Sequence, residues 1–132
     1  INPDAIRYLE ENIRLNRVSN IEAVEGDVKE ICVKFRDKAD RIIMNLPKSA
    51  YLFLHEALSM LKPQGGIIHF YDLESSRSVE ESLIKAKEKF IAHVQELREE
   101  FHFNSVTIRD ARKVKAYAPY TYIIGIDVVV KK

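Results

Sequence analysis

One short stretch of the sequence combines an apolar run, an amide and a proline. Ile42, Ile43 and Met44 show no polar alternation, which predicts a strand covered on both faces. Asn45 follows directly, and Pro47 has no N–H for a strand ladder and therefore ends the strand. An amide carries both a donor and an acceptor, which suits a purine edge, although it can also close an Asx turn. Because ligands bind at the carboxyl edge of open α/β sheets, Asn45 is a candidate binding residue.

The carboxyl-terminal segment is basic and aromatic. From Arg109 to Lys132 the chain carries six lysines or arginines and three tyrosines against two aspartates. Cations beside stacking rings are typical of RNA-binding surfaces. An edge strand whose lysines discourage aggregation has the same composition, so both interpretations stand at this point.

Other reactive side chains indicate structural roles. Asp27 follows a short alternating stretch and Gly26, a position typical of a helix N-cap. His69 lies in an apolar stretch, where a core histidine with a partner is the expected interpretation. Cys32 is the only cysteine, which excludes an internal disulfide, and no His, Cys and Asp grouping has metal-ligand spacing.

The composition is that of a soluble globular protein. The chain has 132 residues, 46% hydrophobic and 31% charged, with a net charge of +1. No apolar run approaches the ~20 residues of a spanning helix, and no leader pattern is present. We therefore expect a single domain over residues 1–132, without a membrane partner, in the cytoplasm.

Helical and strand patterns alternate before two final strands. Asn2, Pro3 and Asp4 form a helix-start signal. The other predicted elements are a strand at 21–25, a short helix or turn at 28–35, a strand at 40–44, a helix from 48 or 49 to 61, a strand at 67–71, a helix at 79–101 and strands at about 104–112 and 121–130. This order predicts an α/β fold with a mostly parallel sheet and an antiparallel carboxyl-terminal strand. No glycine-rich turn is present, so we expect the first strand and glycine-rich loop of such a fold to lie outside this chain.

Several motifs together resemble one family. They are Asn2-Pro3-Asp4-Ala5, Leu15-Asn16, Gly26-Asp27-Val28, the run from Asp40 through Asn45-Leu46-Pro47 to Ala50, Gly65-Gly66-Ile67-Ile68-His69, and Arg112-Lys113-Val114-Lys115-Ala116-Tyr117-Ala118-Pro119. The chain resembles the carboxyl-terminal part of the catalytic domain of archaeal and eukaryotic tRNA (guanine-37, N1) methyltransferases. The resemblance implies a Rossmann-like class I methyltransferase sheet.

The same resemblance implies S-adenosylmethionine as cofactor and the tRNA anticodon loop, at position 37, as partner of a monomeric enzyme. Ile1 would pack on the adenine face, Asp27 would accept a hydrogen bond from the adenine amino group, and the Val28 N–H would reach a ring nitrogen. Asn45 and Pro47 would be catalytic residues: Asn45 would hold the target guanine near the sulfonium methyl, and Pro47 would shape the pocket together with Leu46. Asn45 and Leu46 would also contact the cofactor. The residues expected to contact RNA are Arg112, Lys115 and Tyr117.

No residue of this chain is assigned as the general base, because the family's proposed carboxylate lies upstream of Ile1. Three carboxylates of this chain could be considered in its place: Glu56, Asp72 and Glu74. Glu56 is expected on a solvated helix face, whereas Asp72, at a strand end, is geometrically possible as a base. We therefore expect the 132 residues to be inactive by themselves.

Two alternatives remain open. A wyosine-pathway transferase acting at tRNA position 37 shares this layout, either as an aminocarboxypropyl transferase or as a methyltransferase of a tricyclic base. The aminocarboxypropyl transferase is expected to lack Asn-Leu-Pro, so Asn45 and Pro47 favour methyl transfer. The other alternative is a non-catalytic module that only contacts RNA.

Overall fold

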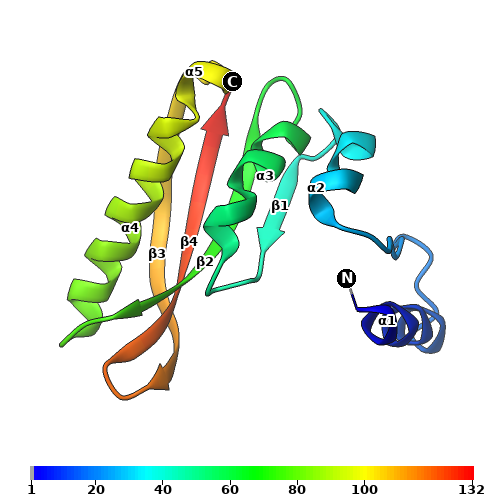
Figure 1. Cartoon of the computed structure of the whole chain (residues 1–132), viewed down its shortest axis with the longest axis horizontal. Coiled ribbons are helices and arrows are strands. Elements are labelled where there is room, and N and C mark those ends of the chain that lie inside the picture. The colour runs from blue at the N-terminus through cyan, green and yellow to red at the C-terminus, as the bar shows by residue number, and fades with distance from the viewer. Residues whose placement is uncertain (1) are drawn as a thin grey trace.

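The computed structural model describes residues 2–132, so Ile1 and the adenine-packing role predicted for it lie outside the described residues. The described residues form a four-stranded sheet. Figure 1 shows α3 and α4 beside this sheet and α1 set apart from it. The elements are α1 (Pro3–Leu15), α2 (Val28–Ile31), the 3₁₀ helix η1 (Cys32–Phe35), β1 (Arg41–Met44), the 3₁₀ helix η2 (Ala50–Phe53), α3 (Leu54–Met60), β2 (Gly66–Ser75), α4 (Val79–Glu96), α5 (Arg98–Phe101), β3 (Ser105–Ala118) and β4 (Thr121–Lys131).

The sheet has the strand order β1-β2-β4-β3. β1 runs parallel to β2, whereas β4 is antiparallel to both β2 and β3. The predicted α/β class is confirmed. Within residues 2–132, β1, β2 and β3 run in the same direction and β4, the carboxyl-terminal strand, runs opposite to them, so the predicted antiparallel carboxyl-terminal strand in an otherwise parallel set is confirmed as well. The short connection between β3 and β4 explains their antiparallel pairing, because strands joined by a tight turn must pair in this way.

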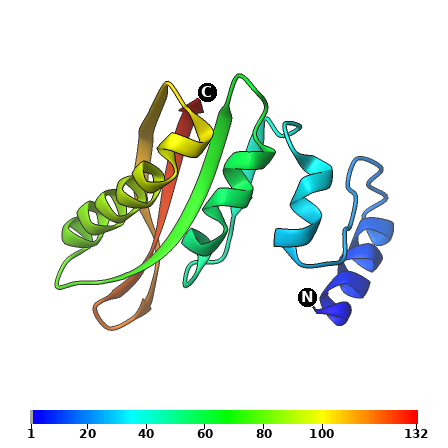
Figure 2. The same cartoon turned by 45° about the horizontal axis from the view of Figure 1, so that its top comes forward.

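The core lies between one face of the sheet and the helices α3 and α4 (Figures 1 and 2). Alternate residues of each central strand point to this face, as the two-residue period of a strand requires. Phe70 of β2 meets Phe90 of α4 edge to face, with ring centroids 5.0 Å apart. The fully buried side chains include Leu54, Leu58, Leu61, Ile68, Ile124, Ile126, Val128 and Val130.

β1 is an edge strand of the described sheet. Met44 is buried, but Ile43, on the opposite face, is 67% exposed. The prediction of a strand covered on both faces is therefore wrong for this chain, because no element of residues 2–132 packs over the Ile43 side. The exposed apolar face is an unsatisfied packing surface.

The amino-terminal segment is ordered locally but not packed. Asn2 caps α1 as predicted, because its side chain accepts hydrogen bonds from the N–H groups of Asp4 and Ala5. No residue of α1 is buried, and Figure 1 shows the helix away from the sheet. Residues 21–25 form no strand, contrary to the prediction, because they pair with no other strand within residues 2–132. No helix in this described range is both long and apolar enough to cross a bilayer.

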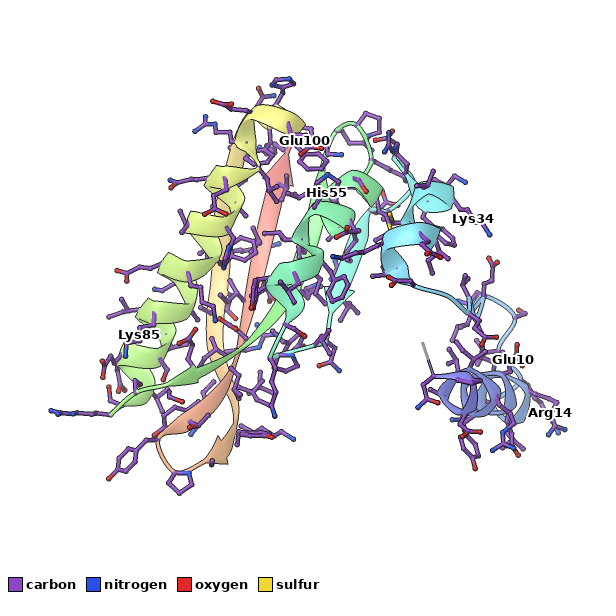
Figure 3. The ribbon with its side chains drawn as sticks, in the orientation of Figure 1. Glu10, Arg14, Lys34, His55, Lys85 and Glu100 are labelled. Atoms are coloured by element: carbon purple, nitrogen blue, oxygen red, sulfur yellow. The ribbon has the colours of Figure 1, made fainter. Side chains whose placement is uncertain are left out.

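The predicted helices differ from the observed ones mainly at their ends. The helix predicted to begin at 48 or 49 opens as η2, and the predicted helix at 79–101 divides into α4 and α5. His102 ends α5 in the left-handed region, with φ at 47°. His55 of α3 and Glu100 of α5 point toward one another, with Nε2 and Oε1 2.8 Å apart, so this contact links α5 to α3 (Figure 3).

Candidate functional site

A cavity of about 230 Å³ lies where β1 ends and the following loop begins. We call it the strand-end cavity. Its lining includes Val28 from α2, Met44 from β1 and Asn45 and Leu46 from the loop. Three of the residues predicted from sequence, Val28, Asn45 and Leu46, are therefore brought together at the carboxyl end of a parallel strand.

The loop after β1 is closed by backbone hydrogen bonds. The Leu46 carbonyl accepts from the N–H groups of Ser49 and Ala50, at 2.9 and 2.8 Å. The Asn45 side chain forms no hydrogen bond within residues 2–132, so the alternative of an Asx turn is not what shapes this loop. The Asn45 amide is exposed and keeps both its donor and its acceptor available to a ligand.

Asp27 acts as the N-cap of α2. Its Oδ1 accepts a hydrogen bond from the Lys29 N–H at 2.9 Å, as the helix-cap interpretation predicted. Capping uses a single carboxylate oxygen and leaves Oδ2 for a ligand. Asp27 is the neighbour of Val28 in the chain but does not itself line the strand-end cavity, so its role toward adenine stays a prediction.

Glu56 was expected on a solvated helix face, and the structure contradicts that expectation. It is 9% exposed and lines the strand-end cavity. The reason is helical spacing, since Phe53, Glu56 and Met60 lie on one face of the η2–α3 segment, and all three line the cavity. Its Oε2 is buried and has no hydrogen-bond partner among the described residues. A buried acceptor without a partner costs folding free energy, so a ligand in this cavity could donate a hydrogen bond to Glu56 Oε2.

The other two carboxylates considered as bases form an ion-pair cluster. The Lys89 ammonium lies 3.0 Å from Asp72 Oδ1, 2.8 Å from Asp72 Oδ2 and 3.0 Å from Glu74 Oε1. Burial and a hydrogen bond with Asp72 raise the pKa of Glu74. Burial alone would lower the pKa of Lys89, but its hydrogen bonds to Asp72 and Glu74 outweigh burial and raise it. This pairing favours a structural role for the cluster, and the general base stays unassigned.

Replacing Lys89 with methionine should destabilise the fold, because Asp72 is 2% exposed and would lose its cation. Lys89 is partly exposed, which weakens the pair, so we expect a loss of about 2 kcal/mol in the free energy of unfolding. Denaturant unfolding of the two proteins measures it. The matched control is Lys87→Met on the same helix, and equal losses in both variants would contradict the assignment.

A chain of polar groups crosses the face of the sheet opposite to α3 and α4. His69 Nδ1 lies 2.6 Å from Asp127 Oδ1, and His69 Nε2 lies 3.0 Å from Arg41 Nη1. Arg112 Nη1 donates to Asp127 Oδ2 and to Asp110 Oδ2, both at 2.9 Å. His69 thus has the partner that was expected for it. The hydrogen bonds that Arg112 donates to Asp127 and Asp110 raise the pKa of Arg112, and they already engage its guanidinium group.

This chain of groups predicts a pH effect. The His69 hydrogen bond and then Arg112 hold the pKa of Asp127 below its ordinary value of 3.8. A carboxyl with a lowered folded-state pKa stabilises the fold above its unfolded pKa and loses that stabilisation as the pH falls through the folded pKa. We expect the free energy of unfolding to fall more steeply below about pH 4 in the wild type than in Asp127→Asn. Denaturant unfolding across acidic pH tests this, with Glu10→Gln as a control on exposed α1, and parallel curves would refute it.

A second space of about 270 Å³ lies on the other side of the loop, and we call it the hairpin hollow. Tyr117 of β3 reaches it and lies beside Lys48, whose Nζ is 5.1 Å from the ring centroid. As hydrogen-bond donor and as positive charge, Lys48 lowers the pKa of the Tyr117 phenol. Leu46 lines both the hairpin hollow and the strand-end cavity.

The sequence-predicted residues therefore divide into three groups. Val28, Asn45 and Leu46 meet at the strand-end cavity, whereas Pro47 and Tyr117 meet at the hairpin hollow. Arg112 lies apart from both, bound to two carboxylates, and Lys115 is exposed on β3. Sequence reasoning missed Lys48, although its position next to Pro47 was a usable signal, and it assigned Glu56 the wrong environment.

Comparison with known proteins identifies the family. The model of the TRM5/TYW2 methyltransferase domain matches residues 1–105. This chain belongs to that family. Trm5b, the tRNA (guanine(37)-N(1))-methyltransferase of Pyrococcus abyssi, is 41% identical over 129 residues, covering 96% of this chain and 34% of the relative. Trm5b of Methanocaldococcus jannaschii is 35% identical over 133 residues, covering 100% of this chain and 33% of the relative. A tRNA(Phe) (4-demethylwyosine(37)-C(7)) aminocarboxypropyltransferase of the same organism is 31% identical over 126 residues, covering 96% and 46%.

Solved structures of this TRM5/TYW2 family confirm the Rossmann-like methyltransferase fold. The crystal structure of Pyrococcus abyssi Trm5b superposes with a TM-score of 0.82 at 40% identity, covering 100% of this chain and 36% of that chain. The complex of M. jannaschii TYW2 with AdoMet gives 0.79 at 27% identity, covering 99% and 55%. A complex of aTrm5 with tRNALeu gives 0.70 at 32% identity, covering 98% and 33%. The chain spans about a third of the length of the Trm5b relatives.

Proposed function

We propose that residues 1–132 form a carboxyl-terminal portion of the catalytic domain of an enzyme that methylates N1 of guanine 37 in tRNA. The observation that carries the proposal is the Asn45-Leu46-Pro47 strand end, with a free amide beside a cavity, in a chain 41% identical to a Trm5b enzyme. The tRNA anticodon loop is the proposed substrate, consistent with the tRNA-bound aTrm5 structure. We propose a monomeric enzyme acting in the cytoplasm.

S-Adenosylmethionine is the proposed cofactor, and the residues present fit it. The strand-end cavity lies at the carboxyl edge of a parallel strand and has mostly apolar walls, which suits an adenine ring. Asp27 keeps one carboxylate oxygen available for the adenine amino group, and the Val28 N–H would meet a ring nitrogen. Leu46 would cover the ring. The cofactor supplies an electrophilic methyl group on its sulfonium.

The residues of this chain then act mainly by positioning. The Asn45 donor and acceptor would hold the guanine edge, and Pro47 would fix the loop that carries it. Attack by N1 requires loss of its proton, and a general base must reach that proton. The proposed base lies in the part of the enzyme upstream of Ile1. Arg112, Lys115 and Tyr117 are the proposed RNA contacts, although the carboxylates on Arg112 make it the weakest of the three.

The test uses the full-length protein that contains this chain, with S-adenosylmethionine and an unmodified tRNA transcript. Mass spectrometry of the digested nucleosides should show N1-methylguanine, and a transcript with adenine at position 37 should give none. Methylation at another position or of another base would refute the proposal.

Aminocarboxypropyl transfer is the second candidate, since one such enzyme is 31% identical to this chain. The same mass analysis separates the two reactions, because the transferred groups differ greatly in mass. A wyosine precursor tRNA as substrate distinguishes methylation of a tricyclic base. RNA binding without any transfer would favour the non-catalytic module.

A further inference from the structure

The hairpin hollow is built from four separate segments. Leu73 of β2 and Ile123 of β4 are cross-strand partners, and they form its floor on the face of the sheet opposite to α4. Pro47 and Lys48 come from the loop after β1, and Tyr117 comes from β3. The hollow therefore has an apolar floor, a rigid proline, an aromatic ring and the carbon stem of Lys48, whose ammonium group lies 5.1 Å from the centroid of that ring.

Tyr117, which lines this hollow, lies at a strand irregularity. The pairing of β3 with β4 shifts between Ala116 and Ala118, so Tyr117 has no partner of its own in the register. A bulge residue of this kind re-aims a side chain, and bulges occur often beside active sites. Tyr120, at the turn of the same hairpin, is 67% exposed and does not line the hollow. Of these two tyrosines, Tyr117 alone lines the hollow beside the loop of Asn45.

The chemistry of the walls selects the occupant. An aromatic ring beside an ammonium group suits a flat base and its phosphate, because stacking tolerates any base and the cation meets the backbone. Lys113 and Lys115 add positive charge along the same strand. Among the described residues, no carboxylate or amide side chain lines the hollow, so no side chain there presents the paired donor and acceptor of an amide to a Watson–Crick edge. Asn45, which carries such an amide, lines the strand-end cavity instead.

We propose that the hairpin hollow is a slot for a nucleobase adjacent to the target guanine, stacked on Tyr117 with its phosphate near Lys48. The proposal rests on the proposed function. Leu46 lines both spaces and directly follows Asn45, so a guanine held at Asn45 and a base in the hairpin hollow would lie close together, on either side of this loop. That arrangement splays two consecutive nucleotides, keeping the target at Asn45 and its neighbour in the slot.

Binding of anticodon stem-loop RNA to the full-length protein tests the slot without any transfer step. The RNAs are an intact stem-loop and two versions with an abasic site on either side of position 37. We expect Tyr117→Ala to weaken binding of the intact RNA by about tenfold, Tyr117→Phe to bind normally and Tyr120→Ala, the matched control, to change little. One of the two abasic RNAs should bind the wild type about tenfold more weakly than the intact RNA does. Its affinity for Tyr117→Ala should be no lower than its affinity for the wild type, because the stacking partner is already missing. Lys48→Gln should reduce the steepness of the plot of log binding constant against log salt concentration by about one, because one phosphate contact is lost.

Three results would overturn the slot. The first is that the losses of RNA affinity caused by Tyr117→Ala and by each abasic site multiply in the combined measurement. The others are equal losses of affinity in Tyr117→Ala and Tyr120→Ala, and no RNA binding by the wild type. Affinity for S-adenosylmethionine serves as the folding check on each variant. If the protein forms N1-methylguanine but the losses of RNA affinity multiply, the slot is refuted and the proposed function stands. If the losses do not multiply for one abasic site but no N1-methylguanine forms, the slot stands as an RNA-base site and the proposed methyl transfer is refuted.

Discussion

Replacing Asn45 with alanine in the full-length protein should lower methyl-transfer turnover by about a hundredfold or more. The Asn45 amide is exposed at the end of β1, and no other group among the described residues uses its hydrogen-bonding capacity. The backbone of Leu46 closes the loop, so removing the amide leaves the loop intact. Affinity for S-adenosylmethionine should change little, because the apolar walls of the strand-end cavity remain.

Single-turnover methylation of tRNA, together with equilibrium binding of the methyl donor, measures both quantities. Asn20→Ala, at an exposed position in the segment after α1, is the control for loss of an asparagine. Asn45→Asp adds a second comparison, since it keeps the size and acceptor but removes the donors. Unchanged turnover in Asn45→Ala would remove this residue from the active site.

Replacing Gly65 with alanine should cost about 3 kcal/mol or more of folding stability. Gly65 has φ at 93°, a conformation that strains a residue with a Cβ. A Cβ there would lie 2.0 Å from the Val130 carbonyl oxygen and 2.9 Å from the Lys131 Cα. These are backbone atoms of β4, which is paired with β2, so the strand cannot move aside without breaking the sheet.

The measurement is denaturant unfolding, with soluble yield as a second indicator. Gln64→Ala is the matched control, since Gln64 is exposed in the same turn. Loss of stability should also lower methylation, but by reducing the folded fraction and not the rate per folded molecule. A Gly65→Ala variant as stable as the control would mean that the β2 and β4 backbones are not held this closely.

Local signals predicted those parts of the fold that depend on neighbours in the chain. The caps at Asn2 and Asp27 were predictable because each satisfies N–H groups within its own helix. Pro47 predicted the end of β1, which places Asn45 at the end of a strand, and the glycine pair at 65 and 66 predicted the break before β2. The candidate cavity followed from that position, since parallel strands collect ligands at their carboxyl edge.

Features that depend on tertiary pairing could not be predicted in the same way. The burial of Glu56 follows from which face of α3 meets the sheet, and the sequence shows only a carboxylate between helical residues. The contact of His69 with Asp127 depends on the register of β2 against β4, across 58 positions of sequence. The exposure of Ile43 and the lack of a strand at 21–25 reflect absent packing partners, which an apolar pattern cannot reveal.

Leu46 has a thermodynamic consequence for the two proposed ligands. A single side chain forms a wall of both the strand-end cavity and the hairpin hollow. If an occupant of one space shifts this wall, the free energy of filling the other changes, and linkage requires the two changes to be equal. Titrating RNA with and without the methyl donor would therefore also give the effect of RNA on donor affinity. The affinities for the two ligands would then be coupled through one leucine, with no contact between the ligands required for that coupling.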